Sequence, residues 1–222
     1  MKRIFFLILL STAIIAGCSK NKKDDSPAPF AYTPTGITGA QSPMGNVGET
    51  ANSSSSAIAG VSNFEAAVTG LNNGISTYTG SAIITNQAIK DLLADFPEII
   101  VNGDTAKTTT MKFKNTAEGI ESCSGPGAGI LVKYSSNIGD TYPINGTTKV
   151  RTVVRKDVND DYYWGGMYIK AMKVEEDRTG MKSLGVSKIA YYANHKWGLV
   201  GFEITFDDQT VVSFPVFSST SN

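Results

Sequence analysis

The 222-residue sequence predicts an α+β fold, in which N-terminal helices pack on an antiparallel sheet that ends in a C-terminal β-meander. Between residues 61 and 96, apolar residues recur at helical spacing. From about residue 108 they alternate with polar residues, which is typical of half-buried strands. A mainly-β up-and-down barrel is the alternative.

The first expected helix covers residues 61–78. Ser62 and Glu65 have the spacing of a capping box, although Gly70 and Gly74 are unfavourable inside a helix. The prediction depends on apolar residues three or four positions apart: Val61, Phe64, Val68, Leu71, Ile75 and Tyr78.

A second amphipathic helix is expected before Pro97, which would end it. Its apolar stripe consists of Ile84, Ala88, Leu92 and Phe96, with Ile89 and Leu93 beside it.

Strands are expected after the helices, at residues 111–113, 129–134 and 149–155. The clearest pair is 200–206 with 212–216, where phenylalanines and aliphatic residues alternate with polar ones on both sides of a short turn. An earlier turn at residues 194–196 would extend this hairpin to a three-stranded meander.

The N-terminus has the pattern of a secretory signal peptide. Lys2 and Arg3 precede an apolar run over residues 4–17, which is shorter than the roughly 20 residues that a membrane-spanning helix needs. The run ends in Ile15-Ala16-Gly17-Cys18, which resembles the lipobox of bacterial lipoproteins. The resemblance implies that a peptidase cleaves before Cys18, that its thiol receives a diacylglyceryl group and that its new amine receives a fatty acyl chain such as palmitate.

Lipidation implies a cell-envelope protein. Ser19 follows the cysteine, where an Asp is the usual signal for retention in the inner membrane, so an outer-membrane location is expected. The run Lys22-Lys23-Asp24-Asp25 resembles an export signal that would make the protein surface-facing. It is equally the charged start of a flexible tether on a periplasm-facing protein.

Three segments are therefore expected: a signal peptide at 1–17, a lipidated cysteine and flexible tether at 18–60, and a single α+β domain at 61–222. Four of the eight prolines lie in residues 19–60, together with several glycines and the serine run 53–56. Such a segment buries too little apolar surface to offset the entropy of ordering it.

The charge balance argues against nucleic-acid binding. The chain has 20 basic and 20 acidic residues, and removal of residues 1–17 leaves 18 and 20, a net charge of −2. After the anchor the mature chain has one further cysteine, Cys123, so no intramolecular disulfide can form.

Residues 157–161 place Asp157, Asn159 and Asp161 at alternate positions, as in a calcium-binding loop. Tyr162 stands where the loop glycine should be and Tyr168 where the bidentate Glu should be. An acidic turn between strands is therefore favoured over a metal site.

The most aromatic stretch, Tyr162-Tyr163-Trp164, is the candidate ligand-binding segment. Aromatic side chains near a turn can stack on sugars or anchor a protein partner. They are also common strand residues that fill cores. The binding hypothesis requires Trp164 to be solvent-accessible.

No catalytic constellation is evident. His195 is the single histidine, so it is the only base available to Cys123, but it falls in an expected exposed turn. The acidic run 175–177 is expected to be solvated. Nucleophile-elbow, phosphate-loop and zinc-ligand patterns are not seen, so no cofactor is expected.

The sequence therefore predicts a lipid-anchored, non-catalytic binding or adhesion module for a protein or glycan partner. A periplasmic small-ligand carrier is the alternative, and an enzyme is less favoured.

Overall fold

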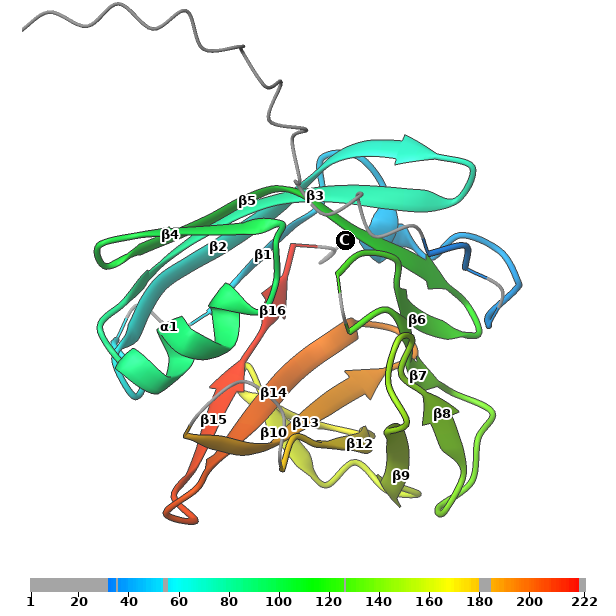
Figure 1. Ribbon diagram of the computed structural model, residues 1–222. Coiled ribbons are helices and arrows are strands. Elements are labelled where there is room, and N and C mark those ends of the chain that lie inside the picture. The colour runs from blue at the N-terminus through cyan, green and yellow to red at the C-terminus, as the bar shows by residue number, and fades with distance from the viewer. Residues whose placement is uncertain (1–31, 35, 54–55, 126, 180–184, 220–222) are drawn as a thin grey trace, which may run out of the picture.

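The computed structural model describes residues 32–34, 36–53, 56–125, 127–179 and 185–219. The described chain is mainly antiparallel β. Two sheets face each other and curl into a half-barrel, and the helix α1 (Gln87–Ala94) lies in the opening between them (Figure 1).

The first sheet has the strand order β16-β1-β2-β3-β5-β6-β7, and β4 adds to it by pairing with β5. The 3-10 helix η1 (Pro43–Gly45) precedes it. Its strands are β1 (Thr50–Asn52), β2 (Val61–Asn72), β3 (Ile75–Ile84), β4 (Ile99–Asn102), β5 (Thr105–Thr116), β6 (Gly119–Ser122), β7 (Gly129–Lys133) and β16 (Phe217–Ser218).

The second sheet has the order β15-β14-β13-β12-β9-β8, and β10 and β11 form a separate hairpin. These strands are β8 (Thr141–Pro143), β9 (Val150–Lys156), β10 (Tyr162–Trp164), β11 (Met167–Ile169), β12 (Met172–Asp177), β13 (Val186–Asn194), β14 (Gly198–Phe206) and β15 (Val211–Pro215). The chain passes directly from β15 to β16, which pairs with β1 and so links the two sheets.

The predicted first helix is wrong, because residues 61–84 form the β2–β3 hairpin. Its turn is Asn73-Gly74, and both residues have positive φ angles (49° and 75°), as the favoured two-residue hairpin turn requires. Two register shifts interrupt β2, one of them between Ser62 and Glu65. Each shift inserts one extra residue between two side chains on the same face of the strand. Their spacing becomes three residues, as on one face of a helix.

The second predicted helix is confirmed, but it is shorter. Ile84 belongs to β3, and α1 begins after Asn86, whose side chain accepts a hydrogen bond from the Ile89 amide at 3.2 Å. Ile89 and Leu92 are buried against both sheets. The C-terminal meander is also confirmed as β13, β14 and β15.

The α+β fold class is therefore a wrong prediction: the described residues contain one α-helix, and two antiparallel sheets build the core. The alternative is right in being mainly β, but its up-and-down barrel is not formed. Most strands are neighbours in sequence order, but the ladder is interrupted between β7 and β8, so the sheets remain separate.

The boundary predicted at residue 61 also needs correction, because residues 36–53 pack on the sheets. Ile37 is 1% exposed, and its carbonyl accepts a hydrogen bond from Lys114 Nζ at 2.6 Å. Ser42 N donates to the Asn115 carbonyl at 2.9 Å, and β1 is a strand of the first sheet. Backbone pairing and one buried isoleucine order a segment whose composition is typical of a linker. Residues 19–31 of the expected tether lie outside the described residues.

Three buried clusters stabilise the fold. The largest lies between the sheets under α1, the second lies between β6, β7 and the second sheet, and the third lies under the β10–β11 hairpin. None of the helices in the described ranges is long and apolar enough to cross a membrane.

Candidate functional site

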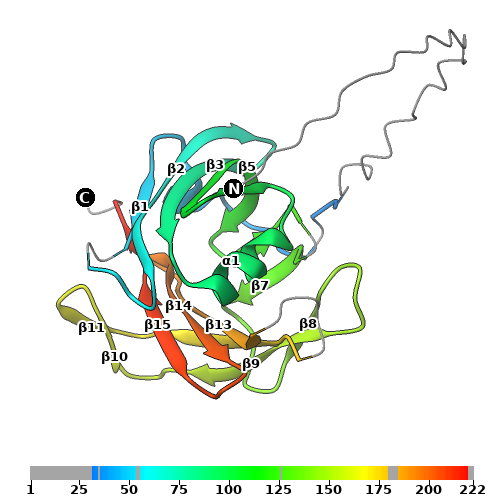
Figure 2. The same ribbon diagram turned by 60° about the vertical axis from the view of Figure 1, so that its left-hand side comes forward.

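The β10–β11 hairpin holds the predicted aromatic segment at the periphery of the second sheet (Figure 2). Its turn is Gly165-Gly166, with φ angles of 57° and 90° that favour glycine. Because strand side chains alternate, the hairpin has one face toward the sheet and one toward solvent.

The inward face is fixed to the core. Trp164 is 6% exposed, its Nε1 donates to the Val216 carbonyl at 2.8 Å, and its ring packs at 5.3 Å from that of Trp197. Tyr162 stacks on Tyr192 with ring centroids 4.8 Å apart. Burial raises the pKa of Tyr162 to about 12. The requirement that Trp164 be solvent-accessible is therefore not met. Trp164 and Tyr162 instead pack the hairpin against the core.

The outward face carries a pair of tyrosines. Tyr163 and Tyr168 are direct cross-strand partners, 65% and 63% exposed, with ring centroids 5.4 Å apart in an edge-to-face arrangement. Met167 beside them is 46% exposed. The sequence analysis did not name Tyr168 as a binding residue. A two-residue turn at Gly165-Gly166 places Tyr163 opposite Tyr168, and this pairing could have been predicted from the sequence.

The acidic turn before this hairpin is an ion-paired turn. Arg155 bonds to the carboxylates of both Asp157 and Asp161, the latter at 2.7 Å, and Asp157 also accepts from the Ala171 amide at 3.2 Å. Burial raises the pKa of Asp157, and the bond to Asp161 adds to this effect. Asn159 is exposed. A guanidinium therefore occupies the place between the two acidic groups where a cation would have to bind.

Across the described ranges, no three side chains of His, Cys, Asp or Glu gather in a way that could hold a metal ion. The structure thus gives no support to the calcium hypothesis.

A buried ionic network lies between the sheets. Glu176 is 1% exposed and accepts hydrogen bonds from Arg151 Nε (2.9 Å), from Arg178 (2.9 Å) and from the Tyr191 hydroxyl (3.1 Å), and Arg151 Nη2 forms an ion pair with it at 2.8 Å. Arg178 also pairs with Asp95 at 3.1 Å, just after α1. The expectation that residues 175–177 are all solvated is wrong for Glu176. The alternation Met172, Val174, Glu176 in β12 could have placed it on the inward face.

Further contacts fix this network between the sheets. Arg151 also donates to the carbonyls of Gly127 and Ile130 at 2.6 and 3.2 Å, and its guanidinium lies 5.6 Å from the centre of the Tyr191 ring. Two arginines and two carboxylates balance in charge. Glu176 is therefore held in place by donors from three side chains.

Within the described residues, Cys123 and His195 are the one cysteine and the one histidine, and the thiol is not activated. Cys123 is buried, its Sγ approaches the Glu121 carbonyl at 3.5 Å, and burial raises the pKa of the thiol to about 12. His195 lies exposed in the turn between β13 and β14.

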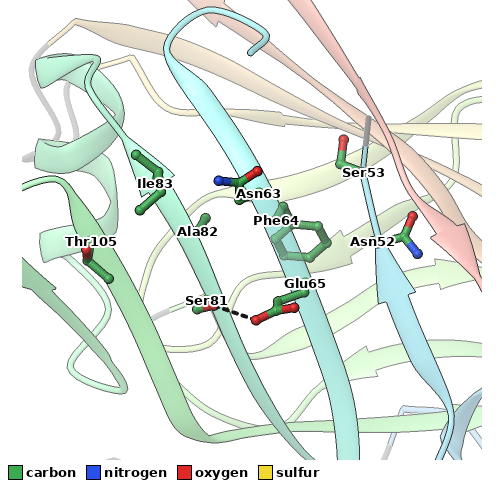
Figure 3. A pocket seen from close by; sticks show the side chains of 9 residues that line it. All are labelled: Asn52, Ser53, Asn63, Phe64, Glu65, Ser81, Ala82, Ile83 and Thr105. Atoms are coloured by element: carbon green, nitrogen blue, oxygen red, sulfur yellow. Dashed lines mark hydrogen bonds between the residues drawn. The ribbon is translucent and has the colours of Figure 1, made fainter. Parts of the chain in front are cut away.

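Two hollows open to solvent on the described surface. One, of about 430 Å³, lies at β2 and β3 and is lined by the nine side chains drawn in Figure 3. The other, of about 450 Å³, lies between the start of α1 and the β14–β15 turn.

No protein-family model, curated protein or solved structure matches the chain. The predicted lipidation residue, Cys18, lies outside the described residues, so its acylation stays a prediction.

Proposed function

We propose that this chain is a lipid-anchored, non-catalytic binding module of the cell envelope, and that the outward face of the β10–β11 hairpin contacts a protein partner. The observation that carries the proposal is the pair of exposed tyrosines, Tyr163 and Tyr168, on a hairpin whose opposite face is held in the core.

The geometry suits recognition because the hairpin that carries the tyrosines is anchored to the core. The Trp164 hydrogen bond and the buried Ile169 hold the hairpin, so little conformational entropy remains to be lost when a partner binds. Tyrosines at the centre of an interface commonly contribute about 2 kcal/mol or more of binding free energy each.

A protein partner is favoured over a glycan at this face. Met167 and Val158, 46% and 78% exposed, belong to the same stretch of chain as the tyrosines. Tyrosine and methionine are enriched in protein interfaces. Binding of a glycan at this face is the alternative outcome of the experiment below.

The anchor supports a location in the envelope. Acylated Cys18 would tie the domain to the outer membrane, because two or three acyl chains on one residue make release negligible. A Cys18→Ala variant is expected to leave the membrane fraction. Shaving of intact cells with protease then separates a surface-facing domain, which is cleaved, from a periplasmic one, which is protected.

The small-ligand carrier and the enzyme have weaker support. A carrier needs an enclosed apolar cavity, whereas the two hollows described here are open and the space between the sheets holds packed side chains and the Arg151–Glu176 network. An enzyme needs a reactive group, and the thiol of Cys123 is held protonated by its raised pKa.

The proposal is tested by affinity capture from membrane extracts of the producing cells. Wild-type protein is compared with Tyr163→Ala/Tyr168→Ala and with Val211→Ala, a control at an exposed position (55%) on β15. We expect a protein that wild type and control retain and the double variant loses, with all three melting at the same temperature. A captured set that is identical for all three would refute the proposal, and selective loss of a polysaccharide would assign the face to glycan binding.

A further inference from the structure

We propose that the hollow at the bulge of β2 binds a neutral oligosaccharide. This site lies on the first sheet and differs from the tyrosine face in position and chemistry, so it goes beyond the proposed function.

The hollow exists because of a β-bulge. Ser62 pairs with Ile83, but Glu65 pairs with Ser81, so β2 has one more residue than β3 between these two pairs. Asn63 takes up the extra length with a φ angle of 52°, a left-handed conformation that Asn accepts more readily than most residues. Bulges of this kind re-aim side chains and are frequent next to functional sites.

The lining matches the chemistry of sugar hydroxyls. Each hydroxyl both donates and accepts hydrogen bonds, and so do the side-chain amides of Asn52 and Asn63. Within the described part of the chain, neither amide has a hydrogen-bond partner, so both are available to a ligand. Figure 3 shows Phe64 between Asn63 and Glu65; its half-buried side chain packs against the core cluster under α1 and also lines the hollow, where it offers the C–H groups of a sugar an apolar contact.

The polar groups are also ordered along a line. Asn52, Glu65 and Ser81 are register partners on β1, β2 and β3, so their side chains share one face of the sheet. The Ser81 hydroxyl donates to Glu65 Oε1 at 3.1 Å, which orients the carboxylate. With neighbouring strands about 4.8 Å apart, the line spans about 10 Å. A volume of about 430 Å³ lies within the range of small-molecule sites.

Glu65 is the one charged side chain among the nine that line the hollow. An acidic group placed against this carboxylate would be repelled, whereas a neutral sugar could donate a hydroxyl to it. The exposed Lys107, the register partner of Ser81 on β5, lies beyond the lining.

The test is titration calorimetry of the full chain with a panel of neutral hexaoses built from glucose, mannose, xylose or N-acetylglucosamine, and with hexagalacturonate as the acidic probe. Asn63→Gly removes the amide and keeps the positive φ angle. Asn73→Gly is its matched control, because Asn73 also has a positive φ angle (49°) but lies in the β2–β3 turn outside the hollow.

We expect saturable binding of at least one neutral hexaose, weakened about fivefold or more by Asn63→Gly, as one lost hydrogen bond would do. Asn73→Gly and Tyr163→Ala/Tyr168→Ala should bind like wild type. Lack of binding to every neutral hexaose, equal weakening by both glycine variants, or tighter binding of hexagalacturonate would each overturn the proposal. Because the tyrosine variant is scored separately, failure here leaves the hairpin proposal standing.

Discussion

Replacement of Glu176 by Gln should be among the most destabilising isosteric changes in this molecule. The carboxylate is 1% exposed and neutralises parts of two guanidinium groups, those of Arg151 (1% exposed) and Arg178 (4%). The Gln side chain keeps the shape of Glu but has no charge. Its NH₂ group is a hydrogen-bond donor and would face N–H donors of the two arginines. Removal of one partner from a buried ion pair costs about 3–5 kcal/mol, because it leaves an uncompensated buried charge.

Urea denaturation measures this cost. With a slope of about 2 kcal/mol per molar urea, a loss of about 3–5 kcal/mol lowers the midpoint by about 1.5–2.5 M at unchanged slope. Glu175→Gln is the matched control, because the neighbouring Glu175 pairs with Lys173 (3.3 Å) and Lys188 (3.1 Å) on the outer face of the same strand. It should cost about 1 kcal/mol or less. Equal midpoints for the two variants would refute the assignment of Glu176 to a buried, charge-balanced network.

Three further predictions test other parts of the account. Ile37→Ala should destabilise the protein by about 2–5 kcal/mol in the same assay, because Ile37 is buried. Val47→Ala, at a 60% exposed position in the same segment, is the control and should leave stability nearly unchanged. If Ile37→Ala also left stability unchanged, residues 36–53 would be a tether after all. In a Cys18→Ala background, Cys123 should resist a maleimide at about pH 8 until denaturant is added. Rapid labelling of the folded protein would contradict this. The pKa of the Cys123 thiol is about 12 in the folded protein and 9.0 ordinarily, so the contribution of the protonated thiol to stability is complete below about pH 9 and is lost as the pH rises to about 12. In a Trp197→Phe background, iodide should quench Trp164 fluorescence weakly in the folded state and strongly after unfolding, and strong quenching of the folded protein would expose an error in the hairpin's orientation.

Alternation of period two was the reliable signal for the fold. It correctly predicted the C-terminal meander, because Ile204 and Phe214 lie on inward faces within the continuous register of β14 and β15. The N-terminal hairpin was missed because one bulge in β2 stretches the spacing from Val61 to Phe64 to three residues, and a second bulge does the same from Val68 to Leu71. The Asn73-Gly74 turn was the local signal that could have corrected it.

The candidate site was only partly readable from the sequence. The aromatic stretch was recognised, but its orientation depends on a hydrogen bond between Trp164 and Val216, which are far apart in the chain. The buried state of Glu176 likewise depends on arginines from other strands. Contacts of this kind are set by tertiary packing, which a single sequence does not reveal.

Site-specific photo-crosslinking in the producing cells tests the central claim most directly. A photoreactive phenylalanine derivative is placed at Tyr168 on the outward hairpin face and, as control, at Val211 on the second sheet. The account predicts a discrete protein adduct from position 168 and none from position 211. No adduct at position 168, or the same adducts at both positions, would contradict the claim that the hairpin is the binding surface.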